Sequence, residues 1–414
     1  MSNSILVVGG GFSGITAALE AAEVGYEVFL IEKNPYLGGR VAQLNQYFPK
    51  LCPPSCGLEI QFQRIRKNSK VKVYTLAEVV SISGAPGEYE VKIKLKPRYV
   101  NEKCTACNDC VDACTTEVPS EFDFGLSTRK AMYRPHIFSF PMRYVLDKEI
   151  CTDAELNAMY SACKYSAIYL NDEEKIFTVN VGSIVWATGW KPYDVTNLTN
   201  LGAGDIPNVI TNMQMERLAA PNGPTEGKLL RPSDNAPAKK VAFVQCAGSR
   251  DQNNLNYCSY ICCMASLKQT TYVRSRYADA EVTIYYIDLR TPGRYDKFMR
   301  QVTADEKVRL VKGKVAGIEA HPSGDVILEV EDAVKGVKSK VRHDLVVLAM
   351  GMQPSVSGCK LPAGIRADED GFVVGEPEKG IFAAGCARVP LDVTRSAQSA
   401  TGAALKAIQT VVGR

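Results

Sequence analysis

Ile5-Leu-Val-Val-Gly-Gly-Gly-Phe-Ser-Gly14 lies near the start of the chain and predicts a nucleotide-binding βαβ unit. The aliphatic run Ile5–Val8 is typical of a strand that is buried on both faces of a parallel sheet. An alanine-rich stretch from Ile15 to about Val24 predicts a helix, and Glu27–Ile31 predicts a second strand that ends at Glu32. This order of strand, glycine turn, helix, strand and acidic residue is far more specific than a glycine motif alone.

The spaced glycines have separate expected roles. Gly9 allows a tight turn, Gly11 lets a pyrophosphate approach the backbone, and Gly14 lets the helix pack closely on the strand. Glu32 is placed to bind the hydroxyl groups of a ribose. The alternative is a glycine-rich loop that serves packing alone, which this context disfavours.

Further motifs resemble those of flavoproteins with two dinucleotide-binding domains. Pro35-Tyr-Leu-Gly-Gly-Arg40 resembles the second fingerprint of that family, in which paired glycines and an arginine cover the FAD pyrophosphate. Ile184–Gly189 resembles the family's strand ending in Ala-Thr-Gly, Leu348–Gly351 is a looser copy, and Gly380–Gly385 resembles the late strand at the flavin end. The resemblance implies an α/β fold with Rossmann-like parallel sheets, β-meanders and bound FAD. The residues expected to bind FAD are Gly9, Gly11, Phe12, Ser13, Gly14, Glu32, Lys33, Gly39, Arg40, Ala187, Thr188, Gly189, Gly385 and Cys386.

Cys386 departs from the family pattern. Most flavoproteins of this type have an aspartate after the late glycine, where it binds the ribityl chain, and Asp392 is the nearby substitute. The alanine-rich stretch from Thr394 to about Val412 predicts a closing helix. In the family, the positive N-terminal end of this helix faces the flavin and favours its anionic reduced form.

Composition limits the other function classes. The chain has 414 residues, 46% of them hydrophobic, and a net charge of only +4 without a basic cluster, which gives no support to nucleic-acid binding. Its longest apolar runs, such as Leu345–Met350, are strand-sized, and no membrane span or export signal is expected, which predicts a cytoplasmic location. Fourteen cysteines in a reducing compartment favour metal or redox chemistry over disulfides.

The first group of cysteines has the spacing of half a bacterial ferredoxin. Four cysteines lie between Cys104 and Cys114 in a C-x₂-C-x₂-C-x₃-C run, which favours an iron–sulfur cluster over zinc. The second half is degenerate and retains Cys151 and Cys163, so the insert is expected to hold one [4Fe-4S] cluster. By the exchange of ligands between ferredoxin halves, Cys163 is the expected fourth ligand, and Cys114 is the open alternative. The expected ligands, here called the first cysteine set, are Cys104, Cys107, Cys110 and Cys163.

A second group replaces a nicotinamide motif. The strand Val241–Val244 is followed by Gln245-Cys-Ala-Gly-Ser-Arg250 and then by Tyr257-Cys-Ser-Tyr-Ile-Cys-Cys263, without a G-x-G-x-x-G turn. Four thiols at one strand–helix junction favour a second cubane cluster over buried inert cysteines or regular zinc. These ligands, here called the second cysteine set, are Cys246, Cys258, Cys262 and Cys263.

Together these motifs resemble the flavin-containing A subunit of heterodisulfide reductase over nearly the whole chain. The chain is shorter than that protein. In its length and its set of motifs it resembles smaller members from sulfate reducers, which belong to a quinone-interacting membrane-bound oxidoreductase complex. The resemblance implies an electron-transfer protein with FAD and two [4Fe-4S] clusters, membrane-associated only through partners. The implied partners are adenylylsulfate reductase, a second flavin/iron–sulfur subunit, and a haem-bearing, quinone-reactive membrane subunit. It leaves open the direction of electron flow and whether the flavin splits electron pairs.

Two other functions remain as alternatives. Cys52 and Cys56 lie near the FAD motif, and a stand-alone FAD-dependent dithiol or disulfide reductase would use them, although isolated structural thiols are the simpler interpretation. The other alternative is a redox-inactive scaffold that binds structural zinc. The three histidines have no ligand spacing, and no residue is assigned a catalytic role. The predicted domains are an FAD-binding domain (1–97), a ferredoxin-like insert (98–171), an FAD-domain continuation and linker (172–235), a second Rossmann-like domain (236–355) and the closing FAD segment (356–414).

Overall fold

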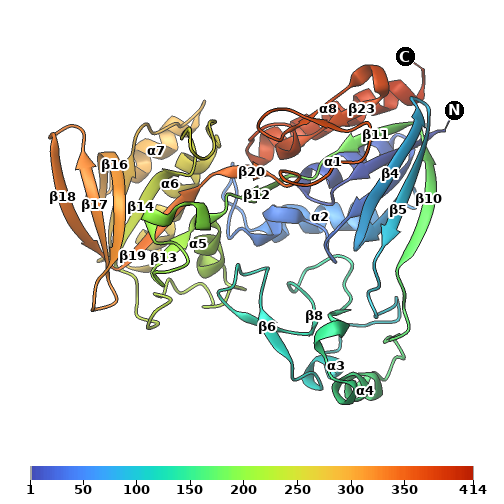
Figure 1. Ribbon diagram of the computed structural model, residues 1–414, viewed down its shortest axis with the longest axis horizontal. Helices are drawn as coiled ribbons and strands as arrows, with labels where there is room; N and C mark the ends of the chain where they lie inside the picture. The colour runs from blue at the N-terminus through green and yellow to red at the C-terminus, as the bar shows by residue number, and fades with distance from the viewer. Residues whose placement is uncertain (1, 414) are drawn as a thin grey trace. The chain divides into compact units, whose positions relative to one another are not determined.

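The computed structural model describes residues 2–413, which form two compact units. The first unit contains the chain up to Trp190 and again from Pro354 onward, and the second unit is Lys191–Gln353. The chain leaves the first unit through β12 (Trp190–Pro192) and returns through β20 (Met352–Pro354), and these two strands pair with each other. Figure 1 follows this path from the blue N-terminal strands to the red C-terminal helix. The finer division predicted from the sequence stays a prediction.

A five-stranded parallel sheet is the centre of the first unit. Its strands are β1 (Ser4–Val8), β2 (Glu27–Glu32), β3 (Val71–Thr75), β11 (Ser183–Trp186) and β23 (Ile381–Ala383). They follow the order β23-β11-β1-β2-β3, and every neighbouring pair is parallel. The carboxyl ends of these strands therefore meet at one edge of the sheet, where nucleotides bind in such folds.

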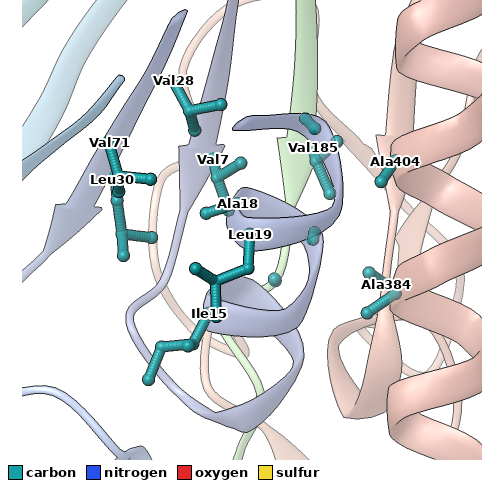
Figure 2. Close-up of a cluster of buried hydrophobic side chains, with 14 of the residues drawn as sticks. Val7, Ile15, Ala18, Leu19, Val28, Leu30, Val71, Val185, Ala384 and Ala404 are labelled. Carbon is teal, nitrogen blue, oxygen red and sulfur yellow. The ribbon is translucent and has the colours of Figure 1, made fainter. Parts of the chain in front are cut away.

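Alternate side chains of β1 face different layers. The surrounding elements are α1 (Phe12–Glu23), α2 (Pro54–Lys67), α8 (Val393–Val411), β4 (Ala77–Ala85), β5 (Glu88–Leu95), β10 (Lys175–Val181), β21 (Arg366–Ala367) and β22 (Val373–Val374). Ile5 and Val7 are buried in a cluster with the three helices, whereas Leu6 and Val8 pack toward the antiparallel sheet β10-β5-β4. Figure 2 shows Val7 together with Leu19 of α1 in the helical layer. The parallel sheet thus lies between helices and an antiparallel sheet.

The segment between β5 and β10 forms a small insert with its own core. Its elements are α3 (Asp109–Asp112), β6 (Glu117–Pro119), β7 (Thr128–Lys130), β8 (Met132–Tyr133), β9 (Val145–Leu146) and α4 (Asp153–Ala162). Met132, Leu146 and Met159 are buried together with two cysteine side chains. A bridge between Val100 and Ile168 joins the two ends of the insert, so the loops that carry the cysteines start from a closed base.

The second unit is built on a seven-stranded mixed sheet. Its elements are β13 (Val209–Thr211), α5 (Asn212–Ala219), β14 (Lys240–Ala247), α6 (Cys262–Arg276), β15 (Glu281–Tyr286), α7 (Tyr295–Thr303), β16 (Val308–Ala320), β17 (Val326–Asp332), β18 (Val337–His343) and β19 (Leu345–Met350). The order is β13-β19-β14-β15-β16-β17-β18, parallel as far as β16 and antiparallel beyond it. The predicted combination of parallel sheets and β-meanders is confirmed.

A buried histidine makes the stability of the second unit depend on pH. His343, at the end of β18, is 1% exposed and its Nε2 hydrogen bonds with Tyr285 at 3.1 Å. Burial, with the charges of Lys240 and Arg309, lowers its pKa from 6.5 to about 4. Between these values the unfolded chain binds a proton that the folded chain does not, so stability falls as the pH falls through this window.

We therefore expect wild-type protein to lose about 2 kcal/mol more unfolding free energy between pH 7 and pH 5 than the variant His343→Gln. Urea unfolding at both pH values, followed by circular dichroism, measures this difference. The control is His321→Gln, because His321 is only half-buried and hydrogen bonds with the neighbouring Ser323. Equal pH dependence in wild type and His343→Gln would show that the buried imidazole does not titrate as stated.

Candidate cofactor sites

The glycine turn after β1 has the close contacts that its sequence predicts. Gly9 has a φ of +110°, and a Cβ there would lie 2.3 Å from the carbonyl oxygen of Ala187. A Cβ on Gly14 would lie 1.7 Å from the Gly9 carbonyl oxygen, so only glycine lets α1 begin so near the strand. Gly11 differs, because the nearest atom to a Cβ there is 3.8 Å away. The fold therefore needs Gly9 and Gly14, while a Cβ on Gly11 would make only an ordinary van der Waals contact with Gly39.

Glu32 is buried at the carboxyl end of β2, beside this turn. Its Oε2 accepts a hydrogen bond from the backbone N–H of Gly10 at 2.6 Å. Its Oε1 accepts two from Asn34, both at 2.8 Å. Burial raises the pKa of Glu32, although these hydrogen bonds oppose the shift. Oε2 accepts only one hydrogen bond and has a further lone pair, which can accept the predicted hydrogen bond from a ribose hydroxyl.

The second glycine stretch packs against the first turn. The Gly38 N–H donates to the Gly10 carbonyl oxygen at 2.8 Å, and a Cβ on Gly39 would lie 2.9 Å from the Gly11 Cα. A short helix, η1 (Gly39–Gln43), begins at this point and carries Arg40. The Arg40 Nε donates to the Trp190 carbonyl oxygen at 3.2 Å. The guanidinium is therefore held beside the glycine turn by contacts of its own.

The carboxyl ends of β11 and β23 complete the edge. Thr188 follows β11, and its buried Oγ1 has no hydrogen-bond partner among residues 2–413. Gly385 has a φ of +60°, and a Cβ there would lie 2.1 Å from Ser13 Oγ, so the two loops are in close contact. Because an unpaired buried hydroxyl is costly, Thr188 indicates a ligand that hydrogen bonds at this edge.

Cys386 and Asp392 have separate environments. Cys386 is buried and its thiol donates to the Leu391 carbonyl oxygen at 3.3 Å. Asp392 caps α8 by accepting the Arg395 N–H at 2.8 Å, which satisfies one free donor of the helix N-terminus. The aspartate that was expected to substitute for Cys386 is thus used as a helix cap.

The residues at this edge fit FAD. The glycine turn at Gly11, the unpaired Thr188 hydroxyl and the buried acid at the end of β2 all lie at the carboxyl edge of the five-stranded parallel sheet. Lys33 is exposed just beyond β2. The other expected residues lie on the same turns and strand ends; they are Phe12, Ser13, Ala187, Gly189 and Gly39.

The first cysteine set lies around one pocket of the insert. All four of its members line this pocket, together with Tyr144 and the aliphatic bridge residues Val100 and Ile168. Burial, and then the neighbouring Cys104, Cys163 and Cys107, raise the pKa of Cys110 to about 12. Four thiols that line one apolar pocket, three of which help to raise the pKa of Cys110, indicate a cationic group that binds thiolates, and an iron–sulfur cluster fits that donor set.

Cys114 lies elsewhere in the insert. Among the described residues it does not line the pocket of the first cysteine set, and it is 1% exposed in the insert core. Its thiol is near the Glu155 carboxylate, as is Cys151, whose pKa is raised to about 11 by burial and then by Glu155 and Cys114. Glu155 also accepts hydrogen bonds from Thr115 and Thr116. The two remaining cysteines thus gather around a carboxylate that is already hydrogen bonded.

The second cysteine set lies where β14 ends and α6 begins. The pairing of β14 with β19 shifts between Val244 and Ala247, and Cys246 at this bulge has a φ of +57°. A bulge redirects a side chain away from the regular pleat. Cys262 and Cys263 are the first two residues of α6, where the helix dipole favours thiolates. Cys258 accepts the Tyr260 N–H at 3.4 Å in the loop between them.

These four thiols are close enough to affect one another. Burial raises the pKa of Cys262 strongly, and the charges of Cys263, Cys246 and Cys258 add to the effect. Gln245 precedes Cys246, is 7% exposed, and neither of its amide atoms has a hydrogen-bond partner in the described chain. An unpaired buried amide beside four gathered thiols fits a cluster whose sulfur atoms accept hydrogen bonds. The sequence analysis did not single out Gln245, although it lies inside the cysteine motif.

Over residues 2–413, no three His, Cys, Asp or Glu side chains are arranged to hold a metal ion. A structural zinc draws four sulfur atoms to about 2.3 Å from one centre. In a cubane each thiolate binds a different iron at a different corner, so the thiols surround the cluster at a greater separation.

Cys52 and Cys56 form a third group of thiols. Cys56 is exposed in the first turn of α2, and Cys52 pairs with Tyr47 in an antiparallel bridge. Partial burial, and then a hydrogen bond with the Cys56 thiol, raise the pKa of Cys52. Tyr47 also contacts Phe12 of the glycine turn, with ring centroids 6.3 Å apart. The two thiols are therefore neighbours near the candidate FAD site.

Comparison with known proteins supports the predicted cofactor classes. Residues 4–53 match the family of FAD dependent oxidoreductases. The chain is 34% identical to the A subunit of the H(2):CoB-CoM heterodisulfide,ferredoxin reductase of Methanothermobacter marburgensis. It is 38% identical to an iron-sulfur A subunit of the CoB–CoM heterodisulfide reductase of Methanopyrus kandleri. Each alignment covers 98% of this chain and 64% of the relative, so the chain spans less than two thirds of these homologues.

Solved structures show the same fold at low sequence identity. The thioredoxin reductase of T. acidophilum aligns with a TM-score of 0.54 and 15% identity, over 99% of this chain and 97% of that one. Bacillithiol disulfide reductase of Bacillus cereus aligns with a TM-score of 0.54 and 13% identity over the full length of both chains. The predicted fold class is confirmed. No helix within the described chain is both long and apolar enough to cross a lipid bilayer.

Proposed function

We propose that this chain, an oxidoreductase with the fold of FAD-dependent oxidoreductases, is an electron-transfer subunit that relays electrons between FAD and two [4Fe-4S] clusters. FAD supplies two-electron chemistry and iron–sulfur clusters supply one-electron transfer. The residues of the glycine turn would bind and orient the flavin nucleotide. The first and second cysteine sets would each hold one cluster in a largely buried pocket.

The observation that carries this proposal is the lining of the insert pocket. Cys104 and Cys107 reach it from one loop, Cys110 from α3, and Cys163 from the end of α4. Core packing does not readily explain why four thiols from separate parts of the insert line one pocket. The relatives support it, since their names describe iron-sulfur subunits of heterodisulfide reductase.

The partners and pathway form part of the proposal. The relatives are subunits of reductases, which supports docking to other redox proteins. Following the resemblance to the shorter sulfate-reducer proteins, the chain would link the quinone pool to adenylylsulfate reductase in dissimilatory sulfate reduction. It would do so in the cytoplasm, through a haem-bearing membrane subunit together with a second flavin/iron–sulfur subunit.

The test is the iron, acid-labile sulfide and flavin content of anaerobically purified protein. We expect about eight irons, about eight sulfides and one FAD per chain. The second candidate function, a dithiol reductase that uses Cys52 and Cys56, is favoured by the contact between these thiols. It predicts flavin without iron, and oxidation of NAD(P)H by the chain alone. Zinc without flavin would contradict both functions.

A further inference from the structure

A group of three charged side chains lies beside the second cysteine set. Arg250 Nη1 is 2.8 Å from Asp288 Oδ2, and Arg290 Nη2 is 3.4 Å from the same oxygen. Asp288 follows the end of β15, next to β14 in the sheet, and its carbonyl oxygen accepts the Cys263 thiol at 3.6 Å. The backbone N–H of Arg290 also interacts with the Cys263 sulfur. Because β14 and β15 are parallel neighbours, their carboxyl ends place these charged side chains beside the second cysteine set.

Arg250 also reaches the other side of the set. Its guanidinium lies near the Cys246 thiol, and its positive charge opposes the effect of burial on the pKa of that thiol. The backbone keeps the side chain in this position, because Arg250 has a φ of +57° and its N–H donates to the Tyr257 carbonyl oxygen at 3.1 Å. A non-glycine residue in the left-handed region costs free energy, which the surrounding contacts must offset. The position of Arg250 is therefore fixed by a specific hydrogen-bonded turn of the backbone.

The charges of this group add to a net value of +1, from two guanidinium groups and one carboxylate. A cluster held by four thiolates gains one negative charge when it is reduced by one electron. A fixed positive charge and N–H hydrogen bonds to its sulfur atoms therefore favour the reduced form. We propose that Arg250, held in place by Asp288, is a positioning residue that raises the reduction potential of the cluster bound by the second cysteine set. This inference rests on the proposed function, because it requires that cluster to be present.

The test is a potentiometric titration of the full chain, in which low-temperature EPR follows the two clusters separately. In Arg250→Gln we expect the reduced-to-oxidised ratio of one cluster to fall roughly tenfold at a given potential, which is about 59 mV for one electron. Arg290→Gln should shift the same cluster in the same direction, by less. Asp288→Asn should shift it in the opposite direction, since it removes the only negative charge of the group while its amide oxygen can still accept a hydrogen bond from Arg250.

The control is Arg300→Gln, because the Arg300 side chain is exposed on α7 and pairs with Asp296 of the same helix. Its potentials should equal those of the wild type. Higher salt should reduce the shifts, because these side chains are partly exposed and salt screens their charges. If Arg250→Gln does not retain its cluster, Arg290→Gln and Asp288→Asn still test the predicted directions of the shift in reduction potential.

The outcomes separate this inference from the proposed function. Unchanged potentials in all three variants with full iron content would overturn the role of Arg250 and leave the electron relay standing. Shifts of one sign in all three would also overturn it. Wild-type protein that contains no iron ligated by Cys258 or Cys262 would overturn both.

Discussion

Gly11→Ala is expected to weaken FAD binding strongly while the fold is retained. The nearest protein atom to a Cβ at Gly11 is 3.8 Å away, and the φ of −76° suits alanine, so the chain itself accepts the methyl group. The same space is where a pyrophosphate would approach the start of α1. Overpacking costs about 1–3 kcal/mol, which weakens binding roughly 5- to 150-fold. Absorbance measures the flavin that the variant releases. Circular dichroism tests whether the variant retains the fold.

Two other glycines serve as comparisons for that variant. Gly14→Ala should fail to fold, because its Cβ would lie 1.7 Å from the Gly9 carbonyl oxygen. Gly402→Ala in α8 meets no atom within 4 Å and should bind FAD like the wild type, with a small gain in helix stability. If Gly11→Ala purifies with one FAD per chain, this turn is not the pyrophosphate site.

The second large effect is expected at the insert. Cys163→Ala should remove the [4Fe-4S] signal of the insert cluster and lower the iron content from about eight to about four per chain. The reason is that Cys163 lines the same pocket as Cys104, Cys107 and Cys110. Iron analysis and low-temperature EPR of anaerobically prepared protein measure the loss. Cluster signals of the second cysteine set should be unchanged.

Cys114→Ala is the matched control. Cys114 comes from the ferredoxin-like run itself, but it is buried near Glu155 and Cys151. This variant should keep about eight irons and both cluster signals. The opposite pattern, with iron lost in Cys114→Ala and kept in Cys163→Ala, would assign the fourth ligand to Cys114. Loss of iron in both variants, with lower helical content, would indicate that the insert core had failed.

The first βαβ unit could be predicted because its information is contiguous. Strand, turn and helix between Ile5 and Glu23 follow from local hydrophobicity and glycine spacing, and the observed β1, α1 and β2 agree with that prediction within a few residues. The role expected of Asp392 shows the limit of such reasoning. A sequence places this carboxylate near Cys386, but only the start of α8 shows that it accepts the Arg395 N–H.

The amino-acid sequence alone determined the class of fold and the contiguous cysteine motifs from which the two sets were predicted, because closely spaced residues constrain local backbone geometry directly. Only the tertiary structure decided which thiols face a common pocket. It separated Cys163 from Cys114, and it brought Asp288 to Arg250 across neighbouring strand ends. The physical reason is that these contacts depend on how distant segments pack, and packing is set by the buried surfaces of the whole unit rather than by any one motif.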